Sequence, residues 1–391
     1  MEISKEHVHS YDDALAAVAP LIHQQMLWSD DTFSRIARYG QIYRHEPLAE
    51  IIQSDLKIPL SAWLKIGLAV FSCLDASFSL SRSKFFELPG LDRKTVEQFF
   101  LMTATSIEEL RLQTKSQQIY GRQWAYTFNP LRKSPINFFS SAPEKVFIPI
   151  PQLLVWRVTD GVYYDLVEAK GNVFAKAFGD ACEIYVGKVL KTALGGKEVE
   201  IHGERPYWRS NSEKAGVDWL ISDHTGHLFL ECKAKRMTLP AKMEGLGASM
   251  DNDLRVLAGY VVQNYKNIQD AMQGFVPGFN SSDLPVFSVV VTLEDWGLHT
   301  TQLKERLDAL VEVALQNAAL PICMKFDYPY KVLSFFQLER YAQDIAKVGI
   351  AKVFSPNAVY SKAVYRGCLF PETLAELMPD IAEAAGFDRF Q

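Results

Sequence analysis

The sequence has few cysteines, and none of them lies in a pairing motif. Only five occur in 391 residues, and no two of them form a CxxC pair: Cys73, Cys182, Cys232, Cys323 and Cys368. Small secreted domains depend on disulfides, and structural zinc sites need clustered Cys and His residues. The scatter therefore argues against a disulfide framework and a zinc finger, and it predicts a protein of a reducing compartment.

The sequence also lacks a targeting signal and a long apolar run. The N-terminus, MEISKEHVHSYDD, does not have the basic-then-apolar pattern of a signal peptide. The most apolar stretch, Ile58 to Leu80, is interrupted by Lys65 and Asp75, which favours a buried helix over a membrane span. We expect a cytoplasmic protein with no membrane partner.

An excess of positive charge is absent as well. The net charge is −5 at pH 7, so the overall field of the protein does not attract nucleic acid. A nucleic-acid-binding function would require a local basic cleft, and Lys233, Lys235, Arg236 and Lys242 are candidates for it. No Walker P-loop and no clear helix-turn-helix occur, which excludes a built-in ATP motor and leaves no visible sequence-specific reader.

Two short runs in which apolar and polar residues alternate lie between Gly216 and Arg236. Each run places three apolar residues on one face: Val217, Trp219 and Ile221 in the first, and Leu228, Leu230 and Cys232 in the second. Asp223 and Gly226 between the runs suit a short turn. The pattern predicts a hairpin of two half-buried strands, in which Trp219 faces Leu230 and Ile221 faces Leu228.

The same register places Asp218 opposite Glu231 on the other face of the hairpin, and Lys233 projects from that face too. Opposed side chains have Cβ atoms about 5 Å apart. Two carboxylates at that separation repel each other unless one is protonated or a cation lies between them. Carboxylate oxygens suit Mg²⁺, which takes few protein ligands, and Lys233 could offset charge on a phosphate. The alternative is an ordinary polar strand face with a cross-strand salt bridge.

The string from Asp218 to Glu231-Cys232-Lys233 resembles the motif of the PD-(D/E)XK nuclease superfamily, which has the restriction-endonuclease-like fold. Gly216-Val217 stands where the family often has proline. The resemblance implies that Asp218 and Glu231 bind Mg²⁺, for which Mn²⁺ can substitute. The backbone carbonyl of Cys232 would be a further ligand, and Lys233 would be the catalytic lysine.

The order of the predicted elements agrees with an αβββαβ core. A helix over Asn172–Leu194, a strand over Val199–Trp208, the hairpin, a helix from about Leu254 to Met272 and a strand at Pro285–Thr292 follow one another. The predicted fold class is α/β, with a mixed sheet flanked by helices and an all-α N-terminal domain. We divide the chain into four parts: a helical domain at 1–125, a proline-rich connector at 126–170, the nuclease core at 171–296 and a C-terminal α/β extension at 297–391.

Further site residues are expected on the two helices of this core. In many members of the resembled family a Glu on the first helix reaches the metal, and Glu183 matches that placement. Gly179 and Gly187 lie one turn to either side, so we expect open space around it, and a solvated helix carboxylate is the alternative. Gln263 and Lys266 on the second helix, together with Lys235 and Arg236, are candidates for substrate binding; an exposed helix face is the alternative for the first two. The interleaved basic and aromatic residues at 111–133 suit either nucleic-acid contact or a packed connector.

These features predict a Mg²⁺-dependent nuclease, with DNA favoured over RNA as the substrate. A nuclease-like fold that binds nucleic acid or serves as a scaffold without catalysis is the alternative. The layout resembles proteins of anti-phage defence, which implies an activating or inhibiting protein partner. Strandedness, endo- or exonuclease action and the oligomeric state are left open.

Overall fold

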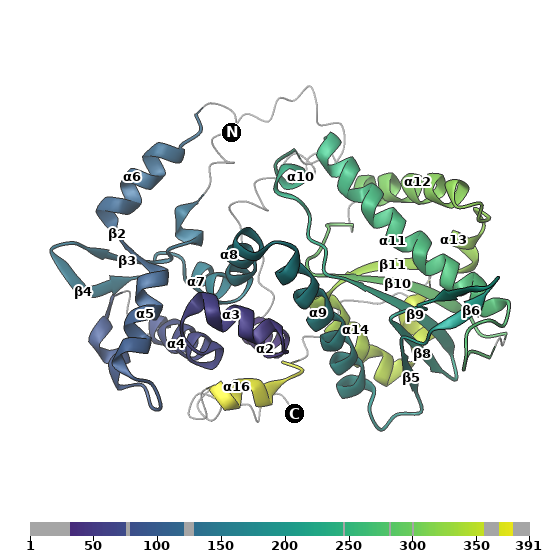
Figure 1. The fold of residues 1–391 in the computed structure, drawn as a ribbon, viewed down its shortest axis with the longest axis horizontal. Helices are drawn as coiled ribbons and strands as arrows, with labels where there is room; N and C mark the ends of the chain where they lie inside the picture. The colour runs from purple at the N-terminus through teal and green to yellow at the C-terminus, as the bar shows by residue number, and fades with distance from the viewer. Residues whose placement is uncertain are drawn as a thin grey trace. The chain divides into compact units, whose positions relative to one another are not determined.

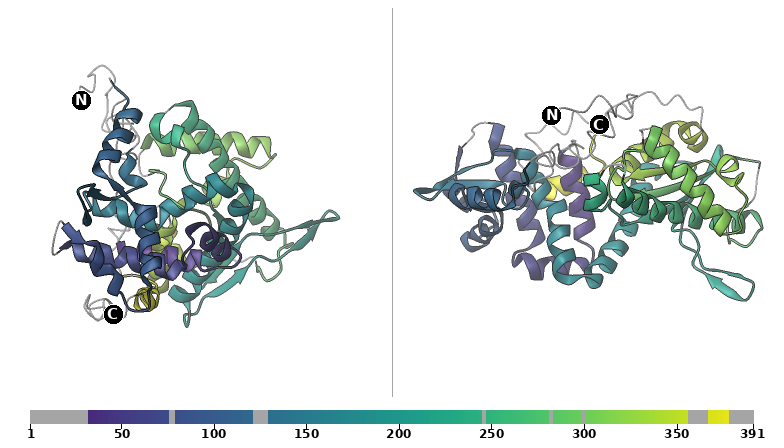
Figure 2. Two further views of the ribbon diagram at one scale, coloured as in Figure 1. Left: turned by 60° about the vertical axis from the view of Figure 1, so that its left-hand side comes forward. Right: turned by 90° about the horizontal axis from the view of Figure 1, so that it is seen from above.

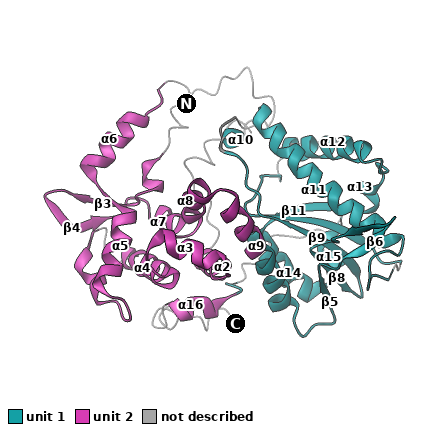
Figure 3. Cartoon of the chain, viewed as in Figure 1, with its two compact units in different colours: residues 1–20, 182–369 teal, residues 21–181, 370–391 magenta. Residues whose placement is uncertain are grey.

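The computed structural model describes residues 32–75, 79–120, 129–244, 247–280, 283–298, 301–355 and 367–377. The chain divides into two compact units (Figure 3): unit 1 comprises Met1–Pro20 and Cys182–Leu369, and unit 2 comprises Leu21–Ala181 and Phe370–Gln391. Both contain helices and sheets, so the protein is mixed α/β. The division falls inside a helix and not in the predicted proline-rich connector. No helix in the described ranges is long and apolar enough to cross a membrane.

A five-stranded mixed sheet forms the centre of unit 1, in the order β11-β10-β9-β8-β5 (Figure 1). Its strands are β5 (Glu200–Gly203), β8 (Trp219–Asp223), β9 (Gly226–Lys233), β10 (Val286–Thr292) and β11 (Tyr330–Ser334). Neighbours among β5, β8 and β9 are antiparallel, whereas β9, β10 and β11 are parallel. The middle strand, β9, therefore joins the antiparallel half of the sheet to the parallel half.

The predicted hairpin register is confirmed for the two apolar pairs that lie within β8 and β9, whereas the predicted pairing of Val217 with Cys232 lies beyond the start of β8. Trp219 lies opposite Leu230 and Ile221 lies opposite Leu228. The Asp223 Oδ1 atom accepts hydrogen bonds from the backbone N–H groups of Thr225 and Gly226, at 2.7 and 3.0 Å, which closes the turn. This is the local role expected of Asp in a tight turn.

The prediction that both strands are half-buried is wrong for β9. Every residue of β9 except Lys233 is buried, including those on the polar face. Phe229 on that face belongs to the same hydrophobic core as Leu257 and Val261 of a covering helix. A strand in the middle of a sheet with helices on both sides has no face left for water.

Helices cover both faces of the sheet (Figures 1 and 2). On one face α11 and α12 form a common hydrophobic core with the strands. On the other, Tyr185 of α9 packs against Phe335 of α14 and donates a hydrogen bond to Glu339 Oε1 at 2.7 Å. The helices of this part of the chain are α9 (Asn172–Leu194, which crosses the division between the units), α10 (Leu239–Glu244), α11 (Ala248–Met272), α12 (Thr301–Asn317), α13 (Met324–Asp327), α14 (Phe335–Val348) and α15 (Ile350–Phe354).

The single strand predicted at Val199–Trp208 is wrong. The segment contains β5 and then β6 (Tyr207–Arg209), which pairs with β7 (Ser212–Lys214) in a separate two-stranded sheet. Pro206 has no backbone N–H, and it lies in the break between the two strands. The Tyr207 hydroxyl donates to Asp270 Oδ2 of α11 at 2.7 Å, and Arg209 pairs with the same carboxylate, which anchors the small sheet.

The predicted all-α N-terminal domain is also wrong, because unit 2 contains a four-stranded sheet in the order β1-β4-β3-β2. β1 and β2 have three residues each, too few to show a period-two pattern. The strands are β1 (Ser79–Ser81), β2 (Ala104–Ser106), β3 (Ile136–Phe139) and β4 (Ala142–Phe147). The α-helices are α2 (Thr32–Tyr43), α3 (Leu48–Leu56), α4 (Leu60–Ser72), α5 (Arg93–Thr103), α6 (Ile107–Gln117), α7 (Pro151–Val158), α8 (Asp160–Lys170) and α16 (Pro371–Leu377); the 3-10 helices are η2 (Cys73–Asp75), η3 (Arg82–Glu87) and η5 (Pro130–Arg132).

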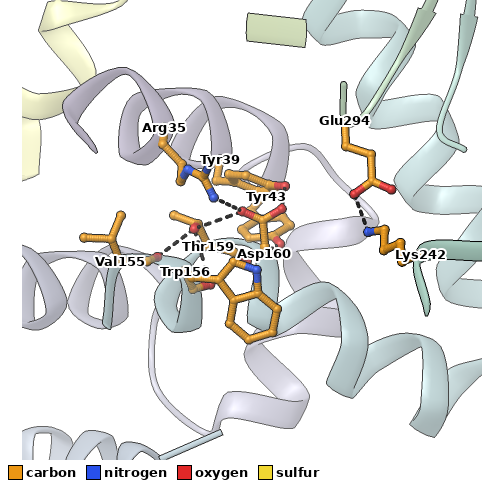
Figure 4. Close-up of polar contacts among 9 residues, drawn as sticks. All are labelled: Arg35, Tyr39, Tyr43, Val155, Trp156, Thr159, Asp160, Lys242 and Glu294. Atoms are coloured by element: carbon orange, nitrogen blue, oxygen red, sulfur yellow. Dashed lines mark hydrogen bonds and ion pairs between the residues drawn. The ribbon is translucent and has the colours of Figure 1, made fainter. Parts of the chain in front are cut away.

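A buried carboxylate organises the helices of unit 2 (Figure 4). Asp160 opens α8, and its Oδ1 accepts from the Tyr39 hydroxyl of α2 at 2.5 Å. Its Oδ2 pairs with the Arg35 guanidinium at 2.9 Å. The Tyr43 hydroxyl donates to the Thr159 carbonyl at 2.6 Å, which adds a second tie between α2 and the start of α8. Because each polar group finds a partner, this network is a structural feature of the unit.

One contact between α9 and the sheet leads to a first prediction. A Cβ atom at Gly187 would collide with the ring of Trp219, so the expectation of open space there is wrong. Gly187→Ala should lower the free energy of unfolding by about 1–3 kcal/mol through overpacking, although Ala is the better helix former. The matched control is Gly259→Ala on α11, where a Cβ would meet nothing within 4 Å. This control should be neutral or stabilising in urea unfolding, and two equal effects would contradict the packing argument.

Candidate functional site

Asp218, Glu231 and Lys233 come together where β8 begins and β9 ends. Gly216 precedes this point with a φ of 98°, and a Cβ there would lie 2.8 Å from the Arg205 carbonyl oxygen, so only glycine fits. Asp218 lies one residue before β8, and its Oδ2 accepts from the Cys232 backbone N–H at 2.6 Å. This side-chain bond links the segment before β8 to β9, and it holds the Asp218 carboxylate beside the end of β9.

Glu231 is the most buried member of the site, with 1% of its surface exposed. Its Oε1 atom accepts two hydrogen bonds, from Lys233 Nζ and from Gln263 Nε2, each at 2.6 Å. Its Oε2 atom is buried and has no hydrogen-bond partner among the described residues. A buried carboxylate oxygen without a partner is costly, so this atom marks a position where a cation or a donor would be stabilising.

Lys233 lies between the two carboxylates and the covering helix. Its ammonium is 5.6 Å from the centre of the Tyr260 ring of α11, and its side chain is 24% exposed. The ammonium is thus held on one side by an aromatic face and on the other by Glu231, while part of it stays accessible. A group in this position can meet an anionic ligand that reaches the carboxylates.

The protonation of the three groups is shifted together. Burial and then the nearby Asp218 charge raise the pKa of Glu231 to about 7, against the Lys233 charge, which lowers it. Burial also raises the pKa of Asp218, against the Cys232 N–H and the Lys233 charge, which lower it. Burial disfavours the Lys233 ammonium, but the charges of Glu231 and Asp218 outweigh it and raise the pKa of Lys233. Carboxyl groups with raised pKa values beside a protonated lysine are typical of functional sites.

Glu204 is a further acidic residue that the sequence reasoning missed. It directly follows β5, in which Gly203 lies opposite Trp219. Continued by one residue, this register places Glu204 opposite Asp218. The pKa of Glu204 is raised by burial and then by the charge of Asp218. The signal in the sequence was the same register argument that paired Asp218 with Glu231, but it requires the true end of β5.

The predicted role of Glu183 as a metal ligand stays a prediction. It lies on α9, half-buried, and its charge contributes to the raised pKa of Glu231. In the described ranges, however, no three His, Cys, Asp or Glu side chains form a cluster suited to a metal ion. The predicted ligand role of the Cys232 carbonyl also stays a prediction, since only its N–H is seen to contact Asp218.

The basic residues after β9 hold the loop that leaves the site. Lys235 pairs with Asp253 at 3.0 Å, and Asp253 Oδ2 also accepts from the Thr238 N–H at 2.6 Å. Lys242 pairs with Glu294 at 2.6 Å (Figure 4). Arg236 is buried, with 9% of its surface exposed. These contacts give the cluster a structural role, and substrate contact by Lys235 and Arg236 stays a prediction.

The remaining candidates are Lys266 and the segment at 111–133, and part of that segment lies outside the described residues. Lys266 is exposed on α11, three residues beyond Gln263. His227 is buried, and its Nδ1 is 2.8 Å from Ser222 Oγ across the hairpin, which agrees with a structural role. Much of the basic and aromatic segment at 111–133 lies outside the described residues: Arg122, Trp124, Tyr126 and Phe128.

The donor set fits a hard divalent cation. The half-buried Asp218 and the buried Glu231 converge, and the Glu231 Oε2 atom is unpartnered among the described residues, whereas Lys233 and Gln263 bind only Oε1. Mg²⁺ prefers oxygen ligands and keeps several waters, so two carboxylates are enough. The fold and site thus define a mixed α/β unit with a buried acidic pair and an adjacent lysine. Comparisons of the chain with models of protein families, with curated proteins and with solved structures found no match.

Proposed function

We propose that the protein is a metal-dependent phosphodiesterase that cleaves nucleic acid, with DNA favoured over RNA. The observation that carries the proposal is the buried Glu231 carboxylate, which lies beside Asp218 and Lys233 and has one oxygen unpartnered. A carboxyl pair of this kind is destabilising by itself, and a bound cation would offset the repulsion.

The strand order supports assignment to the PD-(D/E)XK superfamily. Helix α9 is followed by β5, β8 and β9, of which β8 is antiparallel to both of the others, then by α11 and by β10, which is parallel to β9. This is the αβββαβ order that the sequence motif implies. The acidic pair lies at the end of the sheet where β8 begins and β9 ends, which is where the motif places it.

The residues of the site have distinct roles in this proposal. Asp218 and Glu231 would hold Mg²⁺, which polarises a phosphodiester and lowers the pKa of a water molecule. Lys233 stays protonated because its pKa is raised, so it can offset negative charge that develops on the phosphate. Gln263 donates to Glu231 Oε1 and fixes the orientation of that carboxylate.

The proposal is tested by cleavage of plasmid, linear duplex DNA, single-stranded DNA, total RNA and tRNA in Mg²⁺, Mn²⁺ or EDTA. We expect cutting with either metal and none in EDTA. A thermal-unfolding titration with Mn²⁺ gives a readout that does not need activity: Tm should rise by several degrees at saturation, since a ligand of the folded state stabilises it. Cutting in EDTA, or an unchanged Tm together with no cutting, would contradict the proposal.

A further inference from the structure

Gly259 occupies a position in α11 that no packing contact explains. It lies in the middle of this 25-residue helix and is exposed. A Cβ atom there would meet nothing within 4 Å. Glycine is the poorest helix former after proline. An exposed glycine with free space around it therefore weakens the helix without improving its packing. The absence of a side chain is useful only if something else must come close to the helix at this point.

The position of Gly259 relative to the acidic pair suggests what comes close. Gln263, one turn further along the same face, donates to Glu231. Tyr260, the next residue, lies beneath the Lys233 ammonium. Four residues of helix correspond to a rise of about 6 Å. The bare helix surface at Gly259 is therefore adjacent to the two residues of α11 that contact the acidic pair and its lysine.

Gly259 belongs to a line of exposed residues on one face of α11, which we call the α11 track: Arg255, Gly259, Gln263 and Lys266. Spacings of three and four residues place them on the same face. The track has a cation at each end and no acidic residue. Within the part of the chain that the structure describes, Arg255 pairs with no carboxylate; its guanidinium donates to Asn252 Oδ1.

The dimensions of the track suit a polynucleotide. Eleven residues of helix separate Arg255 from Lys266, a rise of about 16 Å. One strand of duplex DNA advances about 3.4 Å per nucleotide, so the track spans roughly five nucleotides. Two cations at that separation can each pair with a phosphate, while the strand between them passes over the helix.

We propose that the α11 track binds the sugar–phosphate backbone of one nucleic-acid strand, which runs along the helix in contact with Gly259 and so reaches Glu231. Arg255 and Lys266 pair with phosphates on either side of the cleaved bond. This inference rests on the proposed nuclease function and adds the path of the substrate to it. In this proposal the role of Gly259 is to leave room for the nucleic-acid backbone close to the helix.

The test places a side chain in the path. Gly259→Leu is compared with Ala309→Leu, which places the same side chain at an exposed position of α12. For each protein, kcat/KM is measured on a 20-nucleotide DNA and on bis(p-nitrophenyl) phosphate, which has no chain to lay along the helix. We expect the ratio of the two constants to fall at least tenfold in Gly259→Leu, mainly through KM, and to stay at the wild-type value in Ala309→Leu. An unchanged ratio in Gly259→Leu would contradict the proposal that nucleic acid binds along the α11 track.

Binding separates this inference from the proposed function. The fluorescence anisotropy of a labelled 20-nucleotide DNA reports affinity without cleavage, and EDTA prevents turnover. A Kd at least tenfold weaker in Gly259→Leu than in wild type supports the track even if no protein in the series cuts DNA, an outcome that would count against the nuclease chemistry. Equal Kd values in the two proteins overturn the track even if wild type cuts, and so does the absence of binding by wild type.

Discussion

Replacing Glu231 with glutamine is expected to reduce metal-dependent cleavage by about 10³-fold or more, the scale on which a preorganised electrostatic contact acts. The amide keeps an oxygen that can accept hydrogen bonds from Lys233 and Gln263, which now bind Glu231 Oε1 at 2.6 Å. It does not keep the negative charge that a cation needs. The fold should therefore survive while the chemistry is lost, and initial rates of DNA cleavage across a Mg²⁺ series measure the effect.

Asp218→Asn should have an effect of similar size for the same reason. Its amide oxygen can still accept from the Cys232 N–H, the bond that holds the side chain at 2.6 Å. The matched control is Glu200→Gln, which removes an exposed carboxylate from the same sheet. Cleavage by the control should equal that of wild type. Activity of Glu231→Gln within tenfold of wild type would show that the negative charge of Glu231 is not required for cleavage.

Local patterns were enough to predict most of the sheet and helices of unit 1. The hairpin register follows from two apolar runs and one turn, and it is observed at Trp219 and Ile221. The helix at Asn172–Leu194 is observed at its predicted bounds. These elements are predictable because the information that determines them lies within about ten residues of sequence.

The errors occur where neighbours distant in sequence decide the outcome. The polar face of β9 is buried because α11 covers it and β10 pairs alongside, and neither contact is visible in the strand itself. Phe229, between His227 and Glu231, was the one local sign that this face is also buried. The short strands β1 and β2 of unit 2 depend on pairing with β3 and β4 and leave no periodic trace.

The candidate site was predictable in its charged residues but not in its environment. Asp218, Glu231 and Lys233 follow from register and spacing alone, and the structure brings them together. The near-complete burial of Glu231 and the ion pair that fixes Lys235 to Asp253 require the packed helix. The charged residues of the site can thus be identified from the local sequence, whereas their pKa values depend on burial in the tertiary structure.

The burial of Glu231 has a measurable consequence for stability in metal-free buffer. Its pKa is raised from 4.5 to about 7, mainly by burial and then by Asp218. Between these two values the folded protein binds a proton that the unfolded chain does not bind. Stability from this group is therefore greatest at low pH and is lost as the pH rises through 7. The full shift corresponds to roughly 3 kcal/mol.

Glu231→Gln should remove this dependence, because an amide does not titrate. In EDTA at pH 8 the variant should be more stable than wild type by about 2–3 kcal/mol, and the difference should disappear near pH 5. Urea unfolding at several pH values measures it, and subtraction of the two curves cancels the titration of groups that do not interact with Glu231. Saturating Mn²⁺ should stabilise wild type and not the variant, which would reverse the order at pH 8. A difference that does not change with pH would mean that Glu231 is charged at pH 5 as well as at pH 8, and that its environment is already compensated without a cation.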